Sequence, residues 1–139
     1  MVNEKQWTPV VMVDKLGDQG DVVEFKCDDG LAISAGMIMT YESERKISNA
    51  ATLPFAGITA AAKAADDGHT TIPVYTYGIG DFATAGGTIH QGQYMVLSGG
   101  NLIERAQAAK LSGNLLVGQS YAEVTSGASN VIQVKFRGR

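Results

Sequence analysis

The stretch Asn130-Val131-Ile132-Gln133-Val134-Lys135-Phe136-Arg137 has the most regular pattern in the chain. Apolar side chains occupy every second position from Ile132 to Phe136, and polar or charged side chains fill the positions between them. Successive side chains of a β-strand point to opposite faces, so a period of two residues predicts a strand with one buried face. This stretch sets the fold class that the rest of the chain has to match.

Further strands are expected in both directions from this stretch. The clearest are Val22 to Cys27, Met37 to Tyr41, Thr71 to Tyr77 and Gln93 to Leu97. Turn-forming clusters stand between them, namely Asp28-Asp29-Gly30, Asp67-Gly68, Gly86-Gly87 and Gly99-Gly100-Asn101. Candidates for helix are few. Thr59 to Asp66 has high helical propensity, but because it is only two turns long we read it as a strand that continues into a turn, with room for one helical turn. The sequence therefore predicts an all-β protein.

The two halves of the chain resemble each other. Three pairs of segments match in the same order: Ile33 to Met39 with Ile89 to Met95, Phe55 to Gly57 with Leu116 to Gly118, and Ile72 to Gly78 with Ile132 to Gly138. Internal similarity of this kind indicates that one structural unit occurs twice. We expect tandem repeats over about 22–78 and 79–138, which together form one small barrel-like or sandwich-like body over 21–139.

Residues 1–20 lie outside the repeat and are expected to form an extended N-terminal arm and a linker. Thr8 to Val13 is strand-like, and Trp7 is a large aromatic residue just before it. Such an aromatic side chain either folds back onto its own core or anchors the arm on a partner. A strand in an arm can also add to the sheet edge of another protein through main-chain hydrogen bonds.

Composition excludes several classes of function. Of the 139 residues 45% are hydrophobic and 18% charged, and the net charge is −3 with the basic residues scattered, so no nucleic-acid partner is expected. No apolar run approaches the roughly 20 residues that span a bilayer, and the N-terminus lacks the pattern of a signal peptide. We therefore expect no membrane partner. The weakly charged surface suits lasting contact with another protein.

A search for chemistry predicts no catalytic, cofactor-binding or metal-binding residues. The single cysteine, Cys27, ends an alternating apolar run and is interpreted as a small buried hydrophobe. The pairs Asp28-Asp29 and Asp66-Asp67 each stand beside a glycine, which is typical of turns rather than of calcium sites. Residues 78–83 fit a dinucleotide-binding fingerprint, but Gly86-Gly87 would interrupt the helix that this fingerprint requires. The protein is therefore not expected to be an enzyme.

Several short motifs resemble those of head decoration and capsid cement proteins of tailed bacteriophages. They are Pro54-Phe55-Ala56-Gly57-Ile58, the turn Ala65-Asp66-Asp67-Gly68, the stretch from Thr71 to Phe82, Ile89-His90-Gln91-Gly92, the stretch Leu97 to Asn101, and Val117-Gly118. The likeness covers about residues 22–138 and rests on the order of these motifs.

This resemblance implies a homotrimer on the outer capsid surface of a virion, made in the host cytoplasm, that stabilises the mature shell. Its partners would be further copies of itself and the major capsid protein. Members of this family commonly contact the capsid through an N-terminal arm. The capsid-binding residues that the resemblance implies here are Trp7, Pro9, Val10, Val11 and Met12.

Two other functions remain open at this point. A surface-displayed β module could bind a host glycan or receptor through exposed aromatic side chains, for which the chain offers Tyr41, Tyr75, Tyr77, Tyr94 and Tyr121. An enzyme subunit could complete its site across an oligomer interface with His69, His90 or Asp66.

Overall fold

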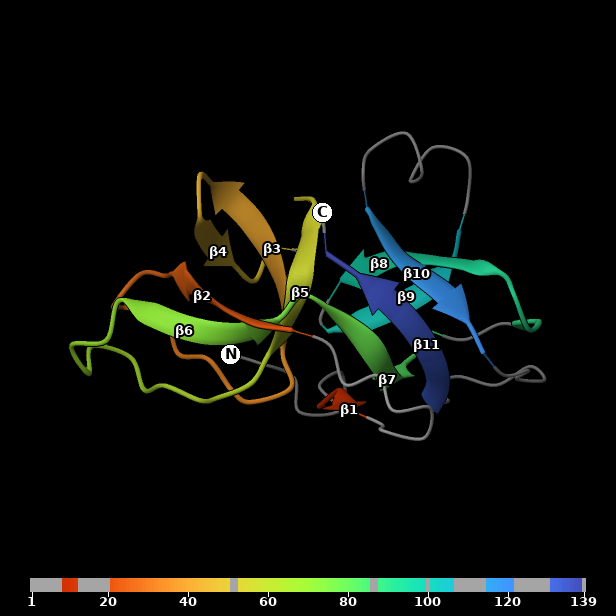
Figure 1. Ribbon diagram of the computed structural model, residues 1–139, viewed down its shortest axis with the longest axis horizontal. Helices are drawn as coiled ribbons and strands as arrows, with labels where there is room; N and C mark the ends of the chain where they lie inside the picture. The colour runs from red at the N-terminus through yellow and green to blue at the C-terminus, as the bar shows by residue number, and fades with distance from the viewer. Residues whose placement is uncertain are drawn as a thin grey trace.

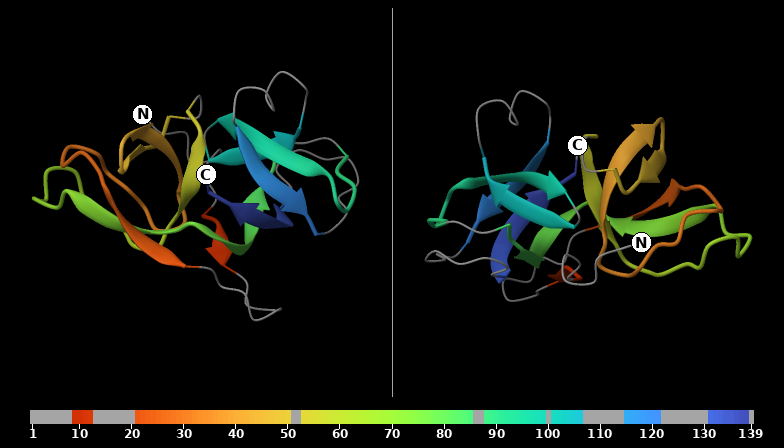
Figure 2. Two further views of the ribbon diagram at one scale, coloured as in Figure 1. Left: turned by 45° about the horizontal axis from the view of Figure 1, so that its top comes forward. Right: turned by 180° about the vertical axis from the view of Figure 1, so that it is seen from behind.

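The structure is a computed structural model of the chain, and it is all-β. It describes residues 9–12, 21–50, 53–85, 88–99, 101–106, 115–121 and 131–138. In these ranges the chain forms a closed five-stranded barrel and a six-stranded antiparallel sheet, with no helix. Barrel and sheet lie side by side along the long axis of the molecule (Figures 1 and 2). The predicted fold class is confirmed at this level.

The barrel is formed by the first half of the chain. Its strands are β2 (Val22–Lys26), β3 (Ile38–Ser43), β4 (Lys46–Ser48), β5 (Phe55–Thr59) and β6 (Thr71–Tyr75). They follow the order β2-β4-β3-β5-β6, and antiparallel pairing of β2 with β6 closes the ring. The barrel interior is filled by Phe25, Cys27, Ile33, Met39, Ile47, Ala56, Ile72 and Val74.

The sheet contains the second half of the chain and one short N-terminal strand. Its strands are β1 (Val11–Met12), β7 (Tyr77–Ala83), β8 (Tyr94–Gly99), β9 (Leu102–Arg105), β10 (Leu116–Ser120) and β11 (Val131–Arg137). They follow the order β1-β7-β11-β10-β8-β9. In β11 the side chains of Ile132, Val134 and Phe136 are buried, which confirms the strand face that the alternating pattern predicts.

Both halves pair their strands according to the same plan. In the barrel, the antiparallel pairs run in the order β2·β6, β6·β5, β5·β3 and β3·β4. In the sheet, the equivalent pairs are β7·β11, β11·β10, β10·β8 and β8·β9. Each half also has one parallel contact, which is Lys26 with Lys46 in the barrel and the isolated bridge Thr84 with Ile103 in the sheet. The halves differ in that β7 also pairs with β1.

A hydrogen-bonded corner occurs at matching positions in the two halves. The Thr59 hydroxyl donates to the carbonyl oxygen of Ser34 at 2.6 Å, and the Ser120 hydroxyl donates to that of His90 at 2.6 Å. The N–H groups of Gly36 and Gly92 donate to the carbonyl oxygens of Thr59 and Ser120. Both glycines have positive φ, 79° and 87°, a conformation that glycine adopts without the strain of a side chain.

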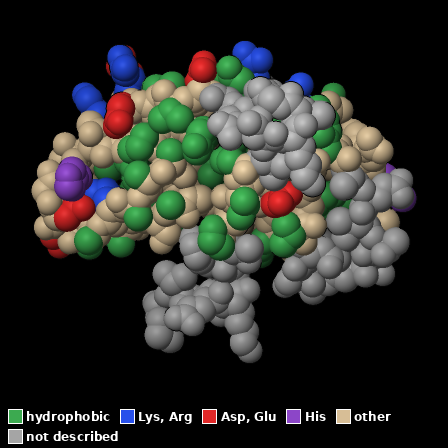
Figure 3. Space-filling view, turned by 60° about the horizontal axis from the view of Figure 1, so that its bottom comes forward, with side chains coloured by type: hydrophobic (Ala, Val, Ile, Leu, Met, Phe, Trp, Pro, Cys, Tyr) green, Lys and Arg blue, Asp and Glu red, His purple; other side chains and the backbone are tan. Residues whose placement is uncertain are grey.

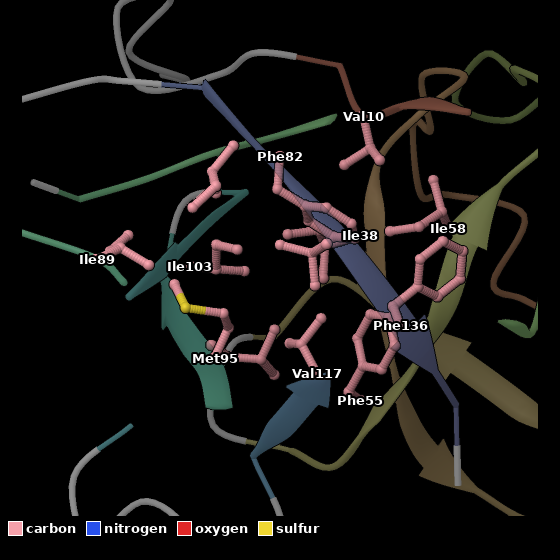
Figure 4. Close-up of a cluster of buried hydrophobic side chains, with 13 residues drawn as sticks. Val10, Ile38, Phe55, Ile58, Phe82, Ile89, Met95, Ile103, Val117 and Phe136 are labelled. Carbon is pink, nitrogen blue, oxygen red and sulfur yellow. The ribbon is translucent and has the colours of Figure 1, made fainter. Parts of the chain in front are cut away.

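The outer face of the barrel packs against the inner face of the sheet. The ring centroid of Phe55, on β5, lies 6.0 Å from that of Phe136, on β11, and Phe136 lies 5.6 Å from Phe82. Figure 4 shows these rings in one cluster with Val10, Ile38 and Ile58. The Ile38 N–H also donates to Asn101 Oδ1 at 2.6 Å. Barrel and sheet therefore share a hydrophobic core.

One expected strand differs from the structure. The strand expected from Thr71 to Tyr77 ends at Tyr75, and residues 77–83 form the separate strand β7. The interruption falls at Thr76, whose N–H donates to Asp21 O and whose carbonyl oxygen accepts from the Gly138 N–H, where the chain passes from barrel to sheet. The segment Thr59 to Asp66 is strand and turn, as expected, and contains no helical turn. The expected turn at Gly86-Gly87 lies outside the described residues.

Candidate functional site

The N-terminal segment 9–12 connects the barrel to the sheet. The Val10 N–H donates to the carbonyl oxygen of Gly36, in the barrel, at 2.8 Å. The next two residues pair with β7, Val11 with Asp81 and Met12 with Gly80. Main-chain hydrogen bonding therefore holds this segment against both halves of the protein.

Side chains of this segment alternate between the core and the solvent. Val10 is 5% exposed and belongs to the shared core, and a side chain at Gly80 would come within 2.8 Å of its Cγ1. Met12 packs partly buried against the same core. Val11 is 58% exposed and Pro9 is also exposed, whereas Trp7 lies outside the described residues. Of the expected capsid-binding residues, Pro9 and Val11 thus face solvent, and Val10 and Met12 pack on their own body.

Other apolar side chains are exposed on the first barrel strand. Val22 is 51% exposed and Val23 is 37% exposed. Figure 3 shows one face of the molecule. Hydrophobic side chains are scattered across the middle of this face, and Lys and Arg side chains lie along its upper margin. Apolar side chains scattered in this way are normal on a protein surface, so they do not by themselves mark a contact with a partner.

A groove of about 350 Å³ lies over four adjacent strands of the sheet, β7, β11, β10 and β8. It is lined by Tyr77, Gly78, Tyr94, Leu116, Val117, Gly118, Gln119, Lys135, Phe136 and Arg137. Strand register places Lys135 opposite Gln119 and Gln119 opposite Tyr94, which gives one row across three strands. Arg137 stands opposite Tyr77 in the neighbouring row. Two tyrosines and two cations therefore border one open groove.

The acidic turns of the barrel surround a buried lysine. The Lys63 ammonium donates to the carbonyl oxygens of Asp29, Leu31 and Ala64 at 2.8 to 3.0 Å. It also lies 3.4 Å from Asp67 Oδ1. The pKa of Asp67 is held well below its usual range. The main cause is the hydrogen bond from the His69 N–H, and smaller contributions come from the His69 imidazole and Lys63. The ammonium group thus lies between Asp29 and Asp67, and residues 29–30 and 65–66 form turns, as the sequence predicts.

The remaining candidate residues are not gathered into one site. Cys27 is buried, as expected, and burial raises the pKa of its thiol. His69 and His90 are both exposed, and the histidine side chains appear at opposite ends of the molecule in Figure 3. Residues 78–83 belong to β7, so no helix N-terminus follows them directly. Among the described residues, no three potential metal ligands lie together.

Sequence reasoning did not find the groove, although the repeat carried a signal for it. Polarity or size differs between the halves at four pairs of matched positions. These pairs are Ile38 and Tyr94, Phe55 and Leu116, Ile58 and Gln119, and Tyr75 and Lys135. A comparison of outward-facing positions between the two repeats would have marked the second half as the more polar. Of the five tyrosines considered for ligand binding, Tyr77 and Tyr94 line the groove.

No protein-family model matches the chain, and no curated protein matches it. Within the part of the chain that the structure describes, no helix has the length and apolar character needed to cross a bilayer.

Proposed function

We propose that this protein is a structural protein of a tailed-bacteriophage virion, which binds the outer surface of the capsid as a homotrimer and stabilises the mature shell. The all-β fold, the low charge content and the motifs of the repeat support this proposal. The body is proposed to be a tandem duplication of one five-stranded unit. The shared strand order and the matching corners at Thr59 and Ser120 support the duplication.

The observation that carries the proposal is the arrangement of residues 9–12. Val10 and Met12 anchor the segment on the shared core, and this leaves Pro9 and Val11 directed outward. An apolar contact presented by an ordered segment loses little conformational entropy on binding. We propose that Pro9 and Val11, continued by residues 1–8, form the contact with the major capsid protein.

The proposed mechanism is thermodynamic linkage. A protein that binds the mature shell, and not its dissociated subunits, stabilises the shell in proportion to its occupancy. A trimer makes three equivalent contacts at once, and these add through effective concentration even when each contact is weak. Such a role requires no reaction and no cofactor.

The test is co-sedimentation of the purified protein with capsids from which it has been removed. Substitution of Val11 by Ser should weaken attachment at least tenfold and leave the melting temperature almost unchanged, because Val11 is 58% exposed. Tyr94→Ser is the matched control, since Tyr94 is 52% exposed and its strand is the fourth from β1 in the sheet. Full attachment of the Val11 variant would contradict the assigned contact, and failure of the unmodified protein to bind would contradict the function.

A further inference from the structure

The same outer surface is buried in one half of the protein and accessible in the other. In the barrel, Ile38, Phe55 and Ile58 lie on this surface and are buried in the core shared with the sheet. The matching positions in the sheet are Tyr94, Leu116 and Gln119, and they line the open groove. The surface that is covered in the first half is thus hollow and accessible in the second.

Two cations line the groove, and no described carboxylate forms an ion pair with either of them. These cations are Lys135 and Arg137, and both are exposed. They lie two residues apart on the same face of β11, so both can reach one ligand. In a chain of net charge −3, this local excess of positive charge favours an anionic ligand.

The aromatic side chains restrict the ligand further. Tyr77 and Tyr94 line the groove, and a tyrosine offers an aromatic ring and a hydroxyl, which suits a ring-shaped molecule with both apolar C–H faces and hydroxyl groups. Gln119 adds an amide between Lys135 and Tyr94. A guanidinium group matches a carboxylate with two parallel hydrogen bonds.

An extended peptide is the less suitable ligand. Each strand below the groove, β7, β8, β10 and β11, is already paired on both sides. Adding a peptide strand requires a free main-chain edge; β8, β10 and β11 have none, and the two residues of β1 cover β7 at Gly80 and Asp81, so no edge is open over the middle of the groove. Recognition must therefore come from side chains, and the volume of about 350 Å³ lies near the lower end of the range for small-molecule sites.

We propose that this groove binds a carboxylated sugar residue, a uronic acid within a glycan. Lys135 and Arg137 bind the carboxylate, Tyr77 and Tyr94 contact the ring, and Gln119 bonds to a hydroxyl. This site is separate from the proposed capsid contact at Pro9 and Val11. A virion carrying the protein would then attach to acidic polysaccharide through many copies, each weak by itself.

The experiment measures binding of trigalacturonic acid to the full-length protein by isothermal titration calorimetry, with its methyl ester as the neutral control. The acid should bind at least tenfold more tightly than the ester. Joint substitution of Lys135 and Arg137 by Gln should weaken binding of the acid at least tenfold, and so should Tyr94→Ser. Lys26→Gln, an exposed lysine on β2, should leave the affinity unchanged.

Several results would overturn the proposal. They are absence of binding to the acid, equal affinity for the ester, equal loss in the Lys26 variant, or tighter binding of a tri-glutamate peptide than of the sugar. Equal binding of inorganic tripolyphosphate would show a response to charge alone and would also overturn it. The Lys135 and Arg137 variant should still sediment with capsids, and if it does not, the groove belongs to the capsid contact instead.

Discussion

At the scale of single residues, one buried charge organises two loops of the barrel. The side chain of Lys63 is only 3% exposed, and burying an ammonium group is unfavourable unless donors and charge are matched. Three carbonyl oxygens and Asp67 provide that match. Asp67 in turn accepts hydrogen bonds from the N–H groups of Ala64 and His69, which fixes the turn before β6.

The lowered pKa of Asp67 predicts a loss of stability in acid. A carboxyl group with a lower pKa in the folded than in the unfolded state stabilises the fold above its unfolded pKa of about 4, and this contribution is lost as pH falls below that value. Asp67→Asn should therefore melt at a lower temperature than the unmodified protein at pH 6, and the two should converge toward pH 2. Thermal melts across this range test the prediction, with Glu24→Gln, an exposed side chain on β2, as the control. A constant difference in melting temperature between the Asp67 variant and the unmodified protein would contradict it.

At the scale of the elements, a glycine sits at the same point of β5 and β10. A Cβ on Gly57 would collide with the carbonyl oxygen of Tyr75, and one on Gly118 with that of Lys135. The pairing register shifts next to both glycines. In the β3–β5 pair the shift falls between Met39 and Thr40, and in the β8–β10 pair it falls between Leu116 and Gly118. The chains can approach this closely because neither glycine has a side chain, which is why these positions match in the repeat.

Alanine at either glycine should be strongly destabilising. Because the colliding atom is main chain and cannot move without breaking the ladder, we expect Gly57→Ala and Gly118→Ala each to cost about 3 kcal/mol or more of unfolding free energy. Gly30→Ala is the control, since its nearest neighbour would be Asp66 Oδ1 at 3.6 Å, an ordinary contact. Chemical denaturation measures all three variants. Losses below about 1 kcal/mol at Gly57 and Gly118 would show that the strands separate easily there.

At the scale of the whole molecule, barrel and sheet depend on each other. Phe136 contacts Phe55 from the barrel and Phe82 from the sheet, so one ring belongs to the packing of both. Val10 joins the same cluster from the N-terminal segment. Separating the halves would expose this cluster to water, which indicates that they fold as one cooperative unit.

Truncation of Phe136 tests this cooperativity. Phe136→Ala should lower the unfolding free energy by about 3 to 5 kcal/mol, the usual cost of removing a buried aromatic ring. The protein should still unfold in one calorimetric transition, shifted as a whole. Val131→Ala, at an exposed position of the same strand, should change little. Two transitions, of which only one moves, would show that barrel and sheet are independent.

Much of the fold follows from local pattern. Alternation in residues 131–137 predicts both a strand and its buried face, because the two-residue period of a strand is a property of the backbone alone. The match of Gly57 with Gly118 predicts equivalent positions in two units, since a close approach of main chains tolerates no other residue. Turn residues such as Asp29-Gly30 mark the ends of strands for a similarly local reason.

Tertiary structure alone decides what each outward face meets. Ile38 and Tyr94 occupy matching strand positions, yet one is buried against the other half of the protein and the other borders a groove. Val10 and Val11 are identical residues, and only the pairing of β1 with β7 places one in the core and the other in solvent. Burial depends on contacts between segments far apart in the chain, and a local sequence pattern does not predict those contacts.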